Sequence, residues 1–410
     1  MPETSPRIDR LLHDLSADGA PVLAEFWREM ADRGTPLVER VDSDSALVTF
    51  LWRGEAAQTS TGWGINLPLR RVPGTDVWHG SERLPLDLHT IYFLRHGATD
   101  LPTDATGRGP THLDPLNHRP FRFPADPADP NDRELWASLL ELPRAPDDPW
   151  SRPRPGVPRG TLLSASVRTT AWGGRRRVAV YRPAAAADGP LPLLVVFDGY
   201  LARALLRVPT TLDNLIAAGR IPPTMALFVT ASSGTRRIDE LRPSAALRAF
   251  VTRDLLPWAR RRWPVTDDPA RRVVAGSSLG GLAAAYVALA EPGAFGAVIA
   301  QSGSFWWPAS AEPAEREWLT RAYAGWPAAP VRFYLDVGDR ENTCPRPGQL
   351  DQLSVSRRFR DLLVARGHQV SYAEYRGGHD YVNWRRTFAD GLRAVLGAGR
   401  REPVPPGRAT

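Results

Sequence analysis

The chain has 410 residues and a formal net charge of +7, and this length favours two or three domains over a single folding unit. Apolar residues make up 42% of the sequence and charged residues 24%, which excludes extensive disorder. A single cysteine, Cys344, excludes disulfide frameworks, cysteine-based zinc sites and iron–sulfur clusters, and the absence of lysine excludes Schiff-base chemistry and the lysine of a nucleotide-binding P-loop.

Residues 1–150 are predicted to form a domain built mostly of strands and loops. Residues 8–33 are an exception, because leucine, phenylalanine, tryptophan and methionine recur there at helical spacing. Further on, Ala46–Arg53 and Thr90–Leu94 are apolar runs rich in strand-forming residues, separated by clusters of proline, glycine and aspartate. This pattern is typical of an N-terminal domain whose core is formed by strands.

A proline-rich passage, Pro143–Pro158, follows. Because proline removes backbone donors, the passage is predicted to be a linker rather than a helix or strand. After it, apolar runs alternate with segments of helical length through residues 159–398, which we assign to a second domain. The runs are 177–181, 193–197, 225–230, 272–275, 297–301, 331–337 and 370–375. The final residues, 399–410, are rich in proline and arginine and are predicted to be disordered.

The alternation in the second domain predicts an α/β fold, with a mostly parallel sheet covered by helices on both faces. Such sheets place their chemistry at the carboxyl ends of the strands. Arginines are spread along the chain among acidic residues, so no nucleic-acid partner is expected. No uncharged apolar run of about 18 residues occurs and the N-terminus lacks a signal pattern, so we expect a cytoplasmic protein without a membrane partner.

The strongest catalytic signal is the sequence Gly276-Ser-Ser278-Leu-Gly280. It fits the G-x-S-x-G pattern of a nucleophile elbow, in which a serine lies on a sharp turn between a strand and a helix. An apolar run precedes it and a run of small, helix-forming residues follows it, as the pattern requires. Ser278 is therefore the predicted nucleophile, and the alternative is a helix-capping serine in a glycine-rich turn.

A nucleophilic serine needs a histidine base, and the histidine needs an acid that orients it. Only His368 and His379 follow the serine motif. His368 precedes the last predicted strand and is interpreted as a solvated turn residue. His379 follows that strand, at the end where the serine is expected, and is the predicted base.

The acid is expected after the strand at 331–337. Asp339 and Glu341 both lie there, and both remain candidates on the residues alone. Asp336 is interpreted instead as part of a strand-end salt bridge. The order of serine, acid and histidine along the chain is the order found in α/β-hydrolases. This chemistry needs no cofactor and no metal.

Two backbone N–H groups are needed to stabilise the oxyanion that forms when the serine attacks. The first candidate is Leu279, directly after the nucleophile. The second is the peptide of Gly199 and Tyr200, where an early strand ends with a glycine that permits close backbone approach. An ordinary strand-ending turn is the alternative for that pair.

Several of these motifs together resemble the enterochelin (enterobactin) esterases, and the resemblance covers most of the chain. It is carried by the following segments: Val48–Arg53, Pro73–Trp78, Asp114–Asn117, Leu140–Pro143, Val196–Gly199, Arg237–Leu241, Leu255–Pro257, Gly276–Gly281, Ser302–Trp307, Gly338–Glu341 and Gly377–Asp380. Members of this family are cytoplasmic serine hydrolases that open ferric tricatecholate trilactones. The chain departs from the family pattern at Ser277 and Leu279, on either side of the nucleophile.

The resemblance implies an all-β, sandwich-like first domain and an α/β-hydrolase second domain. It also favours Glu341 over Asp339, since the acid of the family stands three residues after the glycine that is Gly338 here. The implied substrate is a catecholate trilactone siderophore, with iron present only as part of it. The alternatives are a thioesterase, an acyltransferase, an esterase acting on another peptide ester or aromatic ester, and a non-catalytic siderophore-binding protein.

A ferric triscatecholate is a flat-faced aromatic trianion, which arginine and tryptophan can bind through charge, cation–π contact and stacking. Trp306 and Trp307 follow the run at 297–301 and are predicted substrate contacts, with core packing as the alternative. Arg237 is the third predicted contact, with an ion pair to Glu240 as the alternative.

One motif competes with this interpretation. Arg95-His96-Gly97 after an apolar run is similar to the signature of histidine phosphatases. In that family the motif usually opens the domain, whereas here it follows a β-rich region. We therefore interpret His96 as a loop residue.

Overall fold

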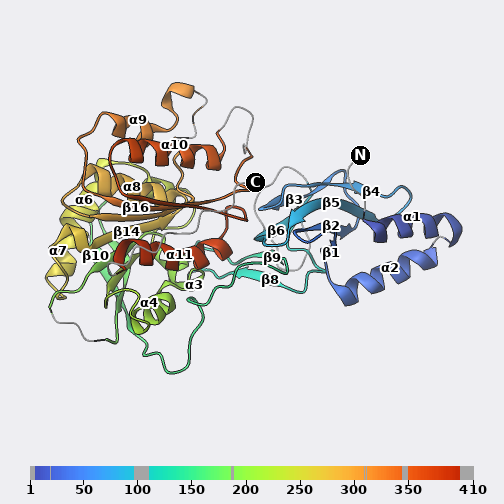
Figure 1. Cartoon of the computed structure of the whole chain (residues 1–410), viewed down its shortest axis with the longest axis horizontal. Coiled ribbons are helices and arrows are strands. Elements are labelled where there is room, and N and C mark those ends of the chain that lie inside the picture. Colours follow the sequence, from blue (N-terminus) through green and yellow to red (C-terminus); the bar gives the residue numbers. More distant parts are fainter. Residues whose placement is uncertain are drawn as a thin grey trace. The chain divides into compact units, whose positions relative to one another are not determined.

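The structure is a computed structural model that describes residues 5–18, 20–96, 110–185, 189–308, 310, 312–343 and 350–397. Contacts between residues divide the chain into two compact units (Figure 1). Unit 1 comprises Met1–Ala125, Arg133–Pro146 and Arg376–Asp380. Unit 2 comprises Asp126–Asp132, Asp147–Tyr375 and Tyr381–Thr410.

Unit 1 contains an antiparallel sheet whose strands follow the order β1-β2-β5-β4-β3-β6-β9-β8, with β7 paired to β6. The strands are β1 (Leu37–Arg40), β2 (Ser45–Arg53), β3 (Thr59–Trp63), β4 (Pro68–Arg71), β5 (Val77–Pro85), β6 (His89–Arg95), β7 (Thr111–His112), β8 (Pro120–Phe123) and β9 (Leu135–Glu141).

This sheet curls on itself. The rings of Phe50 in β2 and Tyr92 in β6 lie 4.9 Å apart, although three strands separate β2 from β6 in the sheet order. The curled face encloses an apolar core that includes both rings. The domain predicted as all-β and sandwich-like is thus built on an antiparallel half-barrel, one bent sheet that encloses the core.

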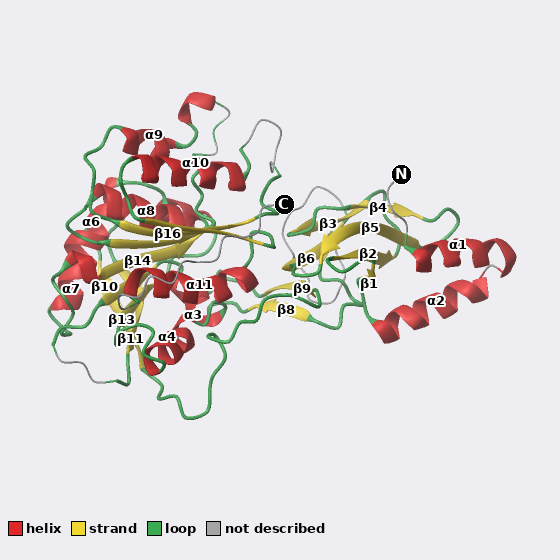
Figure 2. Ribbon diagram, in the orientation of Figure 1, coloured by secondary structure: helices red, strands yellow, loops and turns green. Residues whose placement is uncertain are grey.

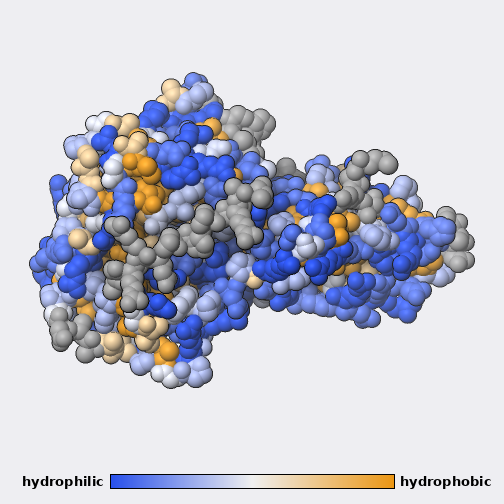
Figure 3. Space-filling view, in the orientation of Figure 1, coloured by the Kyte–Doolittle hydropathy of each residue, from blue (hydrophilic) through white to orange (hydrophobic). Residues whose placement is uncertain are grey.

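Two helices, α1 (Pro6–Asp18) and α2 (Ala20–Arg33), cover the other face of this sheet. Side chains alternate between the faces of a strand, so Phe50 lies in the enclosed core while the adjacent Leu51 packs with Phe26 of α2. The visible face of unit 1 is largely hydrophilic, as expected when the apolar side chains pack on the two faces of the sheet (Figure 3).

Unit 2 contains an eight-stranded sheet with the order β10-β11-β13-β12-β14-β15-β16-β17. The strands are β10 (Thr161–Arg168), β11 (Arg175–Arg182), β12 (Leu193–Val196), β13 (Met225–Val229), β14 (Arg272–Ser277), β15 (Ala297–Gln301), β16 (Arg332–Gly338) and β17 (Val370–Tyr375). Every pair from β13 to β17 is parallel, whereas β10 and β11 pair antiparallel at one edge.

Helices lie on both faces of this sheet (Figure 2). They are α3 (Gly199–Ala204), α4 (Val208–Ala217), α5 (Thr235–Leu241), α6 (Ala245–Ala249), α7 (Leu256–Arg260), α8 (Leu279–Ala290), α9 (Trp318–Ala324), α10 (Gln352–Ala365) and α11 (Tyr381–Leu396), with a π-helical turn at Phe250–Leu255 and short 3₁₀ turns at Pro269–Arg271 and Pro313–Glu315. One apolar core lies between the sheet and α8 and α10, and another lies between the sheet and α4 and α11. Burial on both faces explains why the central strands are continuous apolar runs.

The predicted linker, 143–158, contains neither helix nor strand. Its later residues are nevertheless anchored in unit 2, because the Asn214 side-chain amide donates to the carbonyl groups of Trp150 and Arg152 at 2.7 and 2.8 Å. Two short segments depart from the predicted ranges, since 126–132 belongs to unit 2 and 376–380 to unit 1. The tail predicted at 399–410 lies outside the described residues. Within the described part of the chain, no helix is long and apolar enough to cross a membrane.

Candidate active site

Ser278 lies at the turn where β14 ends and α8 begins. Its backbone has φ 55° and ψ −123°, a conformation that residues other than glycine rarely adopt. Gly276 makes the turn possible, because a Cβ at that position would lie 2.4 Å from the backbone carbonyl carbon of Gly280. Strained backbone of this kind is concentrated at functional sites. The local geometry is that of a nucleophile elbow.

Backbone hydrogen bonds fix this turn to the residues after β15. The Ser278 N–H donates to the Gln301 carbonyl at 2.8 Å, and the Ser304 N–H donates to the Ser278 carbonyl at 3.0 Å. The Ser278 hydroxyl oxygen lies 3.3 Å from the Ser304 hydroxyl oxygen, and Ser278 is partly exposed. The hydroxyl thus has a neighbouring hydroxyl as partner, on a residue that is partly exposed.

The predicted oxyanion donors lie at the starts of two helices. Leu279 opens α8, while Gly199 and Tyr200 open α3. The strands that precede these helices, β14 and β12, are parallel neighbours. A Cβ at Gly280 would lie 3.0 Å from the Asp198 carboxylate, so the two helix starts are close. The first N–H groups of a helix have no acceptor within it, so they are suited to an oxyanion.

Arg237 of α5 forms a two-pronged ion pair with Asp198, with both N···O distances 2.7 Å. Burial lowers the pKa of the Arg237 guanidinium, and the charge of Asp198 more than offsets this, so the net pKa is raised. The pairing considered from the sequence, Arg237 with Glu240, is not the one formed. Asp198 stands at the N-cap position of α3 without a side-chain hydrogen bond to the helix, so the ion pair fixes the residue that precedes Gly199.

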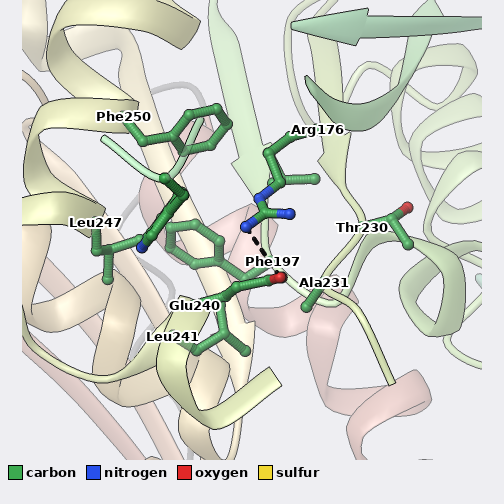
Figure 4. A pocket seen from close by; sticks show the side chains of 10 residues that line it. Arg176, Phe197, Thr230, Ala231, Glu240, Leu241, Leu247 and Phe250 are labelled. Atoms are coloured by element: carbon green, nitrogen blue, oxygen red, sulfur yellow. Dashed lines mark ion pairs between the residues drawn. The ribbon is translucent and has the colours of Figure 1, made fainter. Parts of the chain in front are cut away.

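Glu240 instead binds Arg176 at 3.0 Å and accepts hydrogen bonds from Ser232. This ion pair borders a small pocket in unit 2, shown in Figure 4. The apolar wall of the pocket includes Phe197, which stands directly before Asp198, and Phe250. The pocket wall therefore includes a residue close in sequence to Gly199 and Tyr200, which we call the oxyanion loop.

Glu341 lies in the turn after β16 and is buried, with only 6% of its surface exposed. One carboxylate oxygen accepts hydrogen bonds from the Ser302 hydroxyl at 2.6 Å and from the Gly338 N–H at 2.8 Å. The Ser302 hydroxyl in turn accepts from the Trp384 indole at 3.0 Å. Because β14, β15 and β16 are neighbours, Ser278, Ser302 and Glu341 follow three successive strand ends.

The other two acids near β16 have different surroundings. Asp339 is partly exposed, and its backbone N–H donates to the Tyr375 carbonyl at 2.9 Å. Asp336 is fully buried, and the Gln301 amide donates to it at 3.3 Å. Burial raises the pKa of Asp336 to about 7. Its expected strand-end salt bridge is not formed, because it points into the protein where no arginine pairs with it among the described residues.

The two histidines that follow the serine motif differ in burial. His368 is buried, with 8% exposure, and its ring bonds to the Tyr323 hydroxyl and, at 2.8 Å, to the Val331 carbonyl. The interpretation of His368 as a solvated turn residue is therefore wrong. His379 lies shortly after β17, is partly exposed and belongs to unit 1. Its backbone carbonyl accepts a hydrogen bond from the Trp63 indole at 2.7 Å.

Trp306 and Trp307 follow β15 and are both half-buried. Their rings are 6.2 Å apart and tilted by 46°, and both pack partly against the core of unit 2. Each ring therefore combines core contact with an exposed part.

Sequence reasoning gave no role to Ser302, Ser304 or Asp198. Ser302 and Ser304 carried one available signal, because they directly follow an apolar run at the active end of the sheet.

His96 is not the free nucleophile that a phosphatase motif would require. Its ring nitrogens lie 2.9 Å from a ring nitrogen of His112 and 3.1 Å from the Thr59 hydroxyl, and the ring lies 3.9 Å from the Trp52 ring at a tilt of 30°. Gly97, the last residue of that motif, lies outside the described residues. Across the described ranges, no group of three or more histidine, cysteine, aspartate or glutamate side chains could hold a metal ion.

Known proteins resemble this chain over most of its length. The model of the esterase family matches residues 169–395. The iron(III) enterobactin esterase of Dickeya dadantii is 34% identical, over 90% of this chain and 92% of that protein. The iron(III) salmochelin esterase of Escherichia coli is 31% identical, over 95% and 98%. The crystal structure of ferric enterobactin esterase from Salmonella typhimurium has a TM-score of 0.70 at 27% identity, over 91% and 98%.

Proposed function

The chain belongs to the esterase family, in the group of the iron(III) enterobactin esterases, and from this premise we propose that it hydrolyses the trilactone of a ferric tricatecholate siderophore with Ser278 as nucleophile. The observation that carries the proposal is the backbone of Ser278, held at positive φ between β14 and α8. That geometry presents a hydroxyl at the carboxyl end of a parallel sheet, where it can reach an ester carbonyl.

In the proposed reaction, the Ser278 oxygen attacks an ester carbonyl carbon while His379 takes the hydroxyl proton. The carbonyl oxygen becomes an oxyanion that accepts hydrogen bonds from the N–H groups of Leu279 and of Gly199 or Tyr200. When the intermediate collapses, the carbon–oxygen bond of the ester breaks and His379 gives its proton to the leaving alkoxide. Water then attacks the acyl-enzyme by the same steps, releasing a carboxylic acid and restoring the serine.

Glu341 is proposed as the acid that orients His379 and stabilises its cation. Its hydrogen bonds to Ser302 and Gly338 support this role, because they fix the position of the carboxylate inside the protein. Asp339 has no comparable burial. The chain order of serine, acid and histidine is also that of α/β-hydrolases.

Arg237, Trp306 and Trp307 are proposed to bind the substrate. The ion pair with Asp198 uses Nε and one terminal nitrogen of Arg237, so the second terminal nitrogen is outside it. That nitrogen can attract the trianionic iron–catecholate centre, while the two indoles offer faces for catechol rings. Iron enters as part of the substrate.

The test is to incubate the purified protein with ferric enterobactin and follow linear products by mass spectrometry. Wild-type protein and a control with exposed Ser164→Ala should open the trilactone. Ser278→Ala should slow the reaction by on the order of a millionfold. Intact trilactone after incubation with wild type, or equal turnover by Ser278→Ala, would overturn the proposal.

A further inference from the structure

The histidine segment, Arg376–Asp380, carries His379 and belongs to unit 1. The elements before and after it, β17 and α11, belong to unit 2. At its start, the His89 N–H donates to the Arg376 carbonyl at 3.4 Å. The contacts then continue through Gly378, His379 and Asp380. The predicted base is thus fixed by residues far away in the sequence.

The strongest of these contacts joins two side chains. The Thr90 hydroxyl in β6 donates to the Asp380 carboxylate at 2.6 Å, and both residues are completely buried. A hydrogen bond to a carboxylate is stronger than one between neutral groups, so loss of the Thr90 hydroxyl should loosen the position of Asp380. Asp380 directly follows His379, so this bond fixes the backbone next to the histidine.

Two glycines allow the segment to approach. A Cβ at Gly378 would lie 2.5 Å from the Gly64 Cα, and a Cβ at Gly64 would lie 1.9 Å from the Thr90 hydroxyl oxygen. A side chain at Gly378 would require the backbone to move, and a side chain at Gly64 would displace the Thr90 hydroxyl. The close approach of the two backbones therefore depends on a glycine in each of them, Gly64 after β3 and Gly378 in the histidine segment.

Trp63 provides the third contact and does so from an unusual backbone conformation. Its φ is 77°, which a bulky residue rarely adopts, and strain of this kind persists where a function requires it. The ring is stacked on Phe123, with centroids 5.4 Å apart, and its indole N–H donates to the His379 carbonyl at 2.7 Å. The strained residue therefore donates to the backbone of the predicted base itself.

We infer that unit 1 positions the catalytic histidine, with Thr90 and Trp63 as positioning residues for His379. The inference rests on the proposed function, in which His379 is the base. Neither residue exchanges a proton with substrate in this role. They fix the carbonyl group of His379 and the residue that follows it, and a misplacement of about 1 Å can lower a rate by about a hundredfold.

The test compares variants that keep or remove the Thr90 hydroxyl. Thr90→Val has nearly the same shape without the donor, and should lower kcat for ferric enterobactin about tenfold while KM changes by less than about twofold. Thr90→Ser keeps the donor and should restore kcat to within about threefold of wild type. The rate at which a fluorophosphonate probe labels Ser278 should fall in parallel with kcat, because labelling needs the same base without the siderophore.

Thr49→Val is the matched control. Thr49 is also buried in the sheet of unit 1, its hydroxyl bonds to the Ser81 hydroxyl at 2.9 Å, and that bond involves no residue of the histidine segment. It should leave kcat within about twofold of wild type, because only folding energy is affected. Should Thr90→Val fail to fold, Trp63→Phe removes the second donor and should lower kcat with the same unchanged KM.

Three results would overturn the inference: wild-type kcat in Thr90→Val, an equal loss in Thr90→Ser, or an equal loss in Thr49→Val. His379→Ala separates this failure from failure of the proposed function. If His379→Ala is inactive while Thr90→Val is fully active, only the positioning role is lost. If His379→Ala keeps full turnover, the proposed function itself is wrong.

Discussion

The central strands of unit 2 run parallel, whereas the strands of unit 1 run antiparallel, and we propose different roles for the two sheets in catalysis. In unit 2, parallel strands end at the same edge, so Ser278 after β14, Ser302 after β15 and Glu341 after β16 follow neighbouring strands. In unit 1 the strands run antiparallel and enclose a core, and the contacts with the histidine segment come from β3, β6 and the turns beside them. In our proposal, the parallel sheet brings the reactive groups together, whereas the curled sheet holds the segment that carries the base.

Apart from loss of the nucleophile itself, the largest effect predicted for unit 2 concerns the acid. Glu341→Gln keeps the oxygen that accepts from Ser302 and Gly338 but removes the charge, so kcat should fall on the order of 10⁴-fold. Asp339→Asn, two residues earlier, should change kcat by less than about threefold. Steady-state kinetics with ferric enterobactin measures both, and the reverse ranking would move the acid to Asp339.

A smaller loss is expected where the oxyanion loop meets the sheet. A Cβ at Gly199 would lie 2.4 Å from the Phe228 carbonyl carbon in β13, so Gly199→Ala must displace the start of α3. Loss of one oxyanion donor should lower kcat by about 100- to 1000-fold. Gly293→Ala is the control, because nothing lies within 4 Å of a Cβ there. Turnover by Gly199→Ala equal to that of Gly293→Ala would remove Gly199 and Tyr200 from the oxyanion site.

Unit 2 should lose stability as the pH rises through the range in which Asp336 becomes charged. The unfolded chain releases this proton near its ordinary pKa of 3.8, whereas burial raises the pKa in the folded protein to about 7. The stabilising effect of the proton is complete below pH 3.8 and is lost as the pH rises to 7. Asp336→Asn cannot ionise, so it should gain stability over wild type as the pH rises. The difference in melting temperature, variant minus wild type, should be about 4 °C larger at pH 8 than at pH 5. A difference that does not change with pH would contradict this.

The smallest predicted effect lies in unit 1 and has the opposite sign. Burial, together with the charge of His112, lowers the pKa of His96 from 6.5 to about 4. The unfolded chain therefore binds the proton first, and stability is lost as the pH falls from 6.5 toward 4. His96→Phe keeps an aromatic ring on Trp52 and cannot be protonated. From pH 7 to pH 5, the protection factors of β6 amides, which compare exchange with the intrinsic rate at each pH, should fall about threefold less in this variant than in wild type. An equal fall would exclude His96 as the cause.

The strands of unit 2 were predictable because both faces of its sheet are buried. Apolar runs at 193–197, 225–230 and 297–301 correspond to β12, β13 and β15 almost residue for residue, and these strands are fully buried. In unit 1, short strands such as β4 and β8 carry proline and arginine and are half-exposed, so no apolar run marks them. The curl of that sheet also depends on contacts between distant strands, such as Phe50 with Tyr92, that no local pattern reveals.

The same distinction applies to the site. The elbow at Ser278 was predictable because its glycines and its turn are local in the sequence. The partner of Arg237 was not, since Asp198 and Glu240 are both acidic and only the fold decides which one is near. His368 was misjudged because its partners, Tyr323 and Val331, are distant in the chain. The contact of Thr90 with Asp380 joins residues from the two ends of the sequence.

The most direct measurement is to treat the protein with a fluorophosphonate probe, digest it and locate the adduct by mass spectrometry. Ser277, Ser302 and Ser304 all lie near the proposed nucleophile, so the position of the adduct discriminates among four hydroxyls. We predict a single adduct on Ser278, formed in wild type and absent from Ser278→Ala. An adduct on one of the other three serines, or none on a folded protein that opens the trilactone, would contradict the assignment of Ser278 as nucleophile.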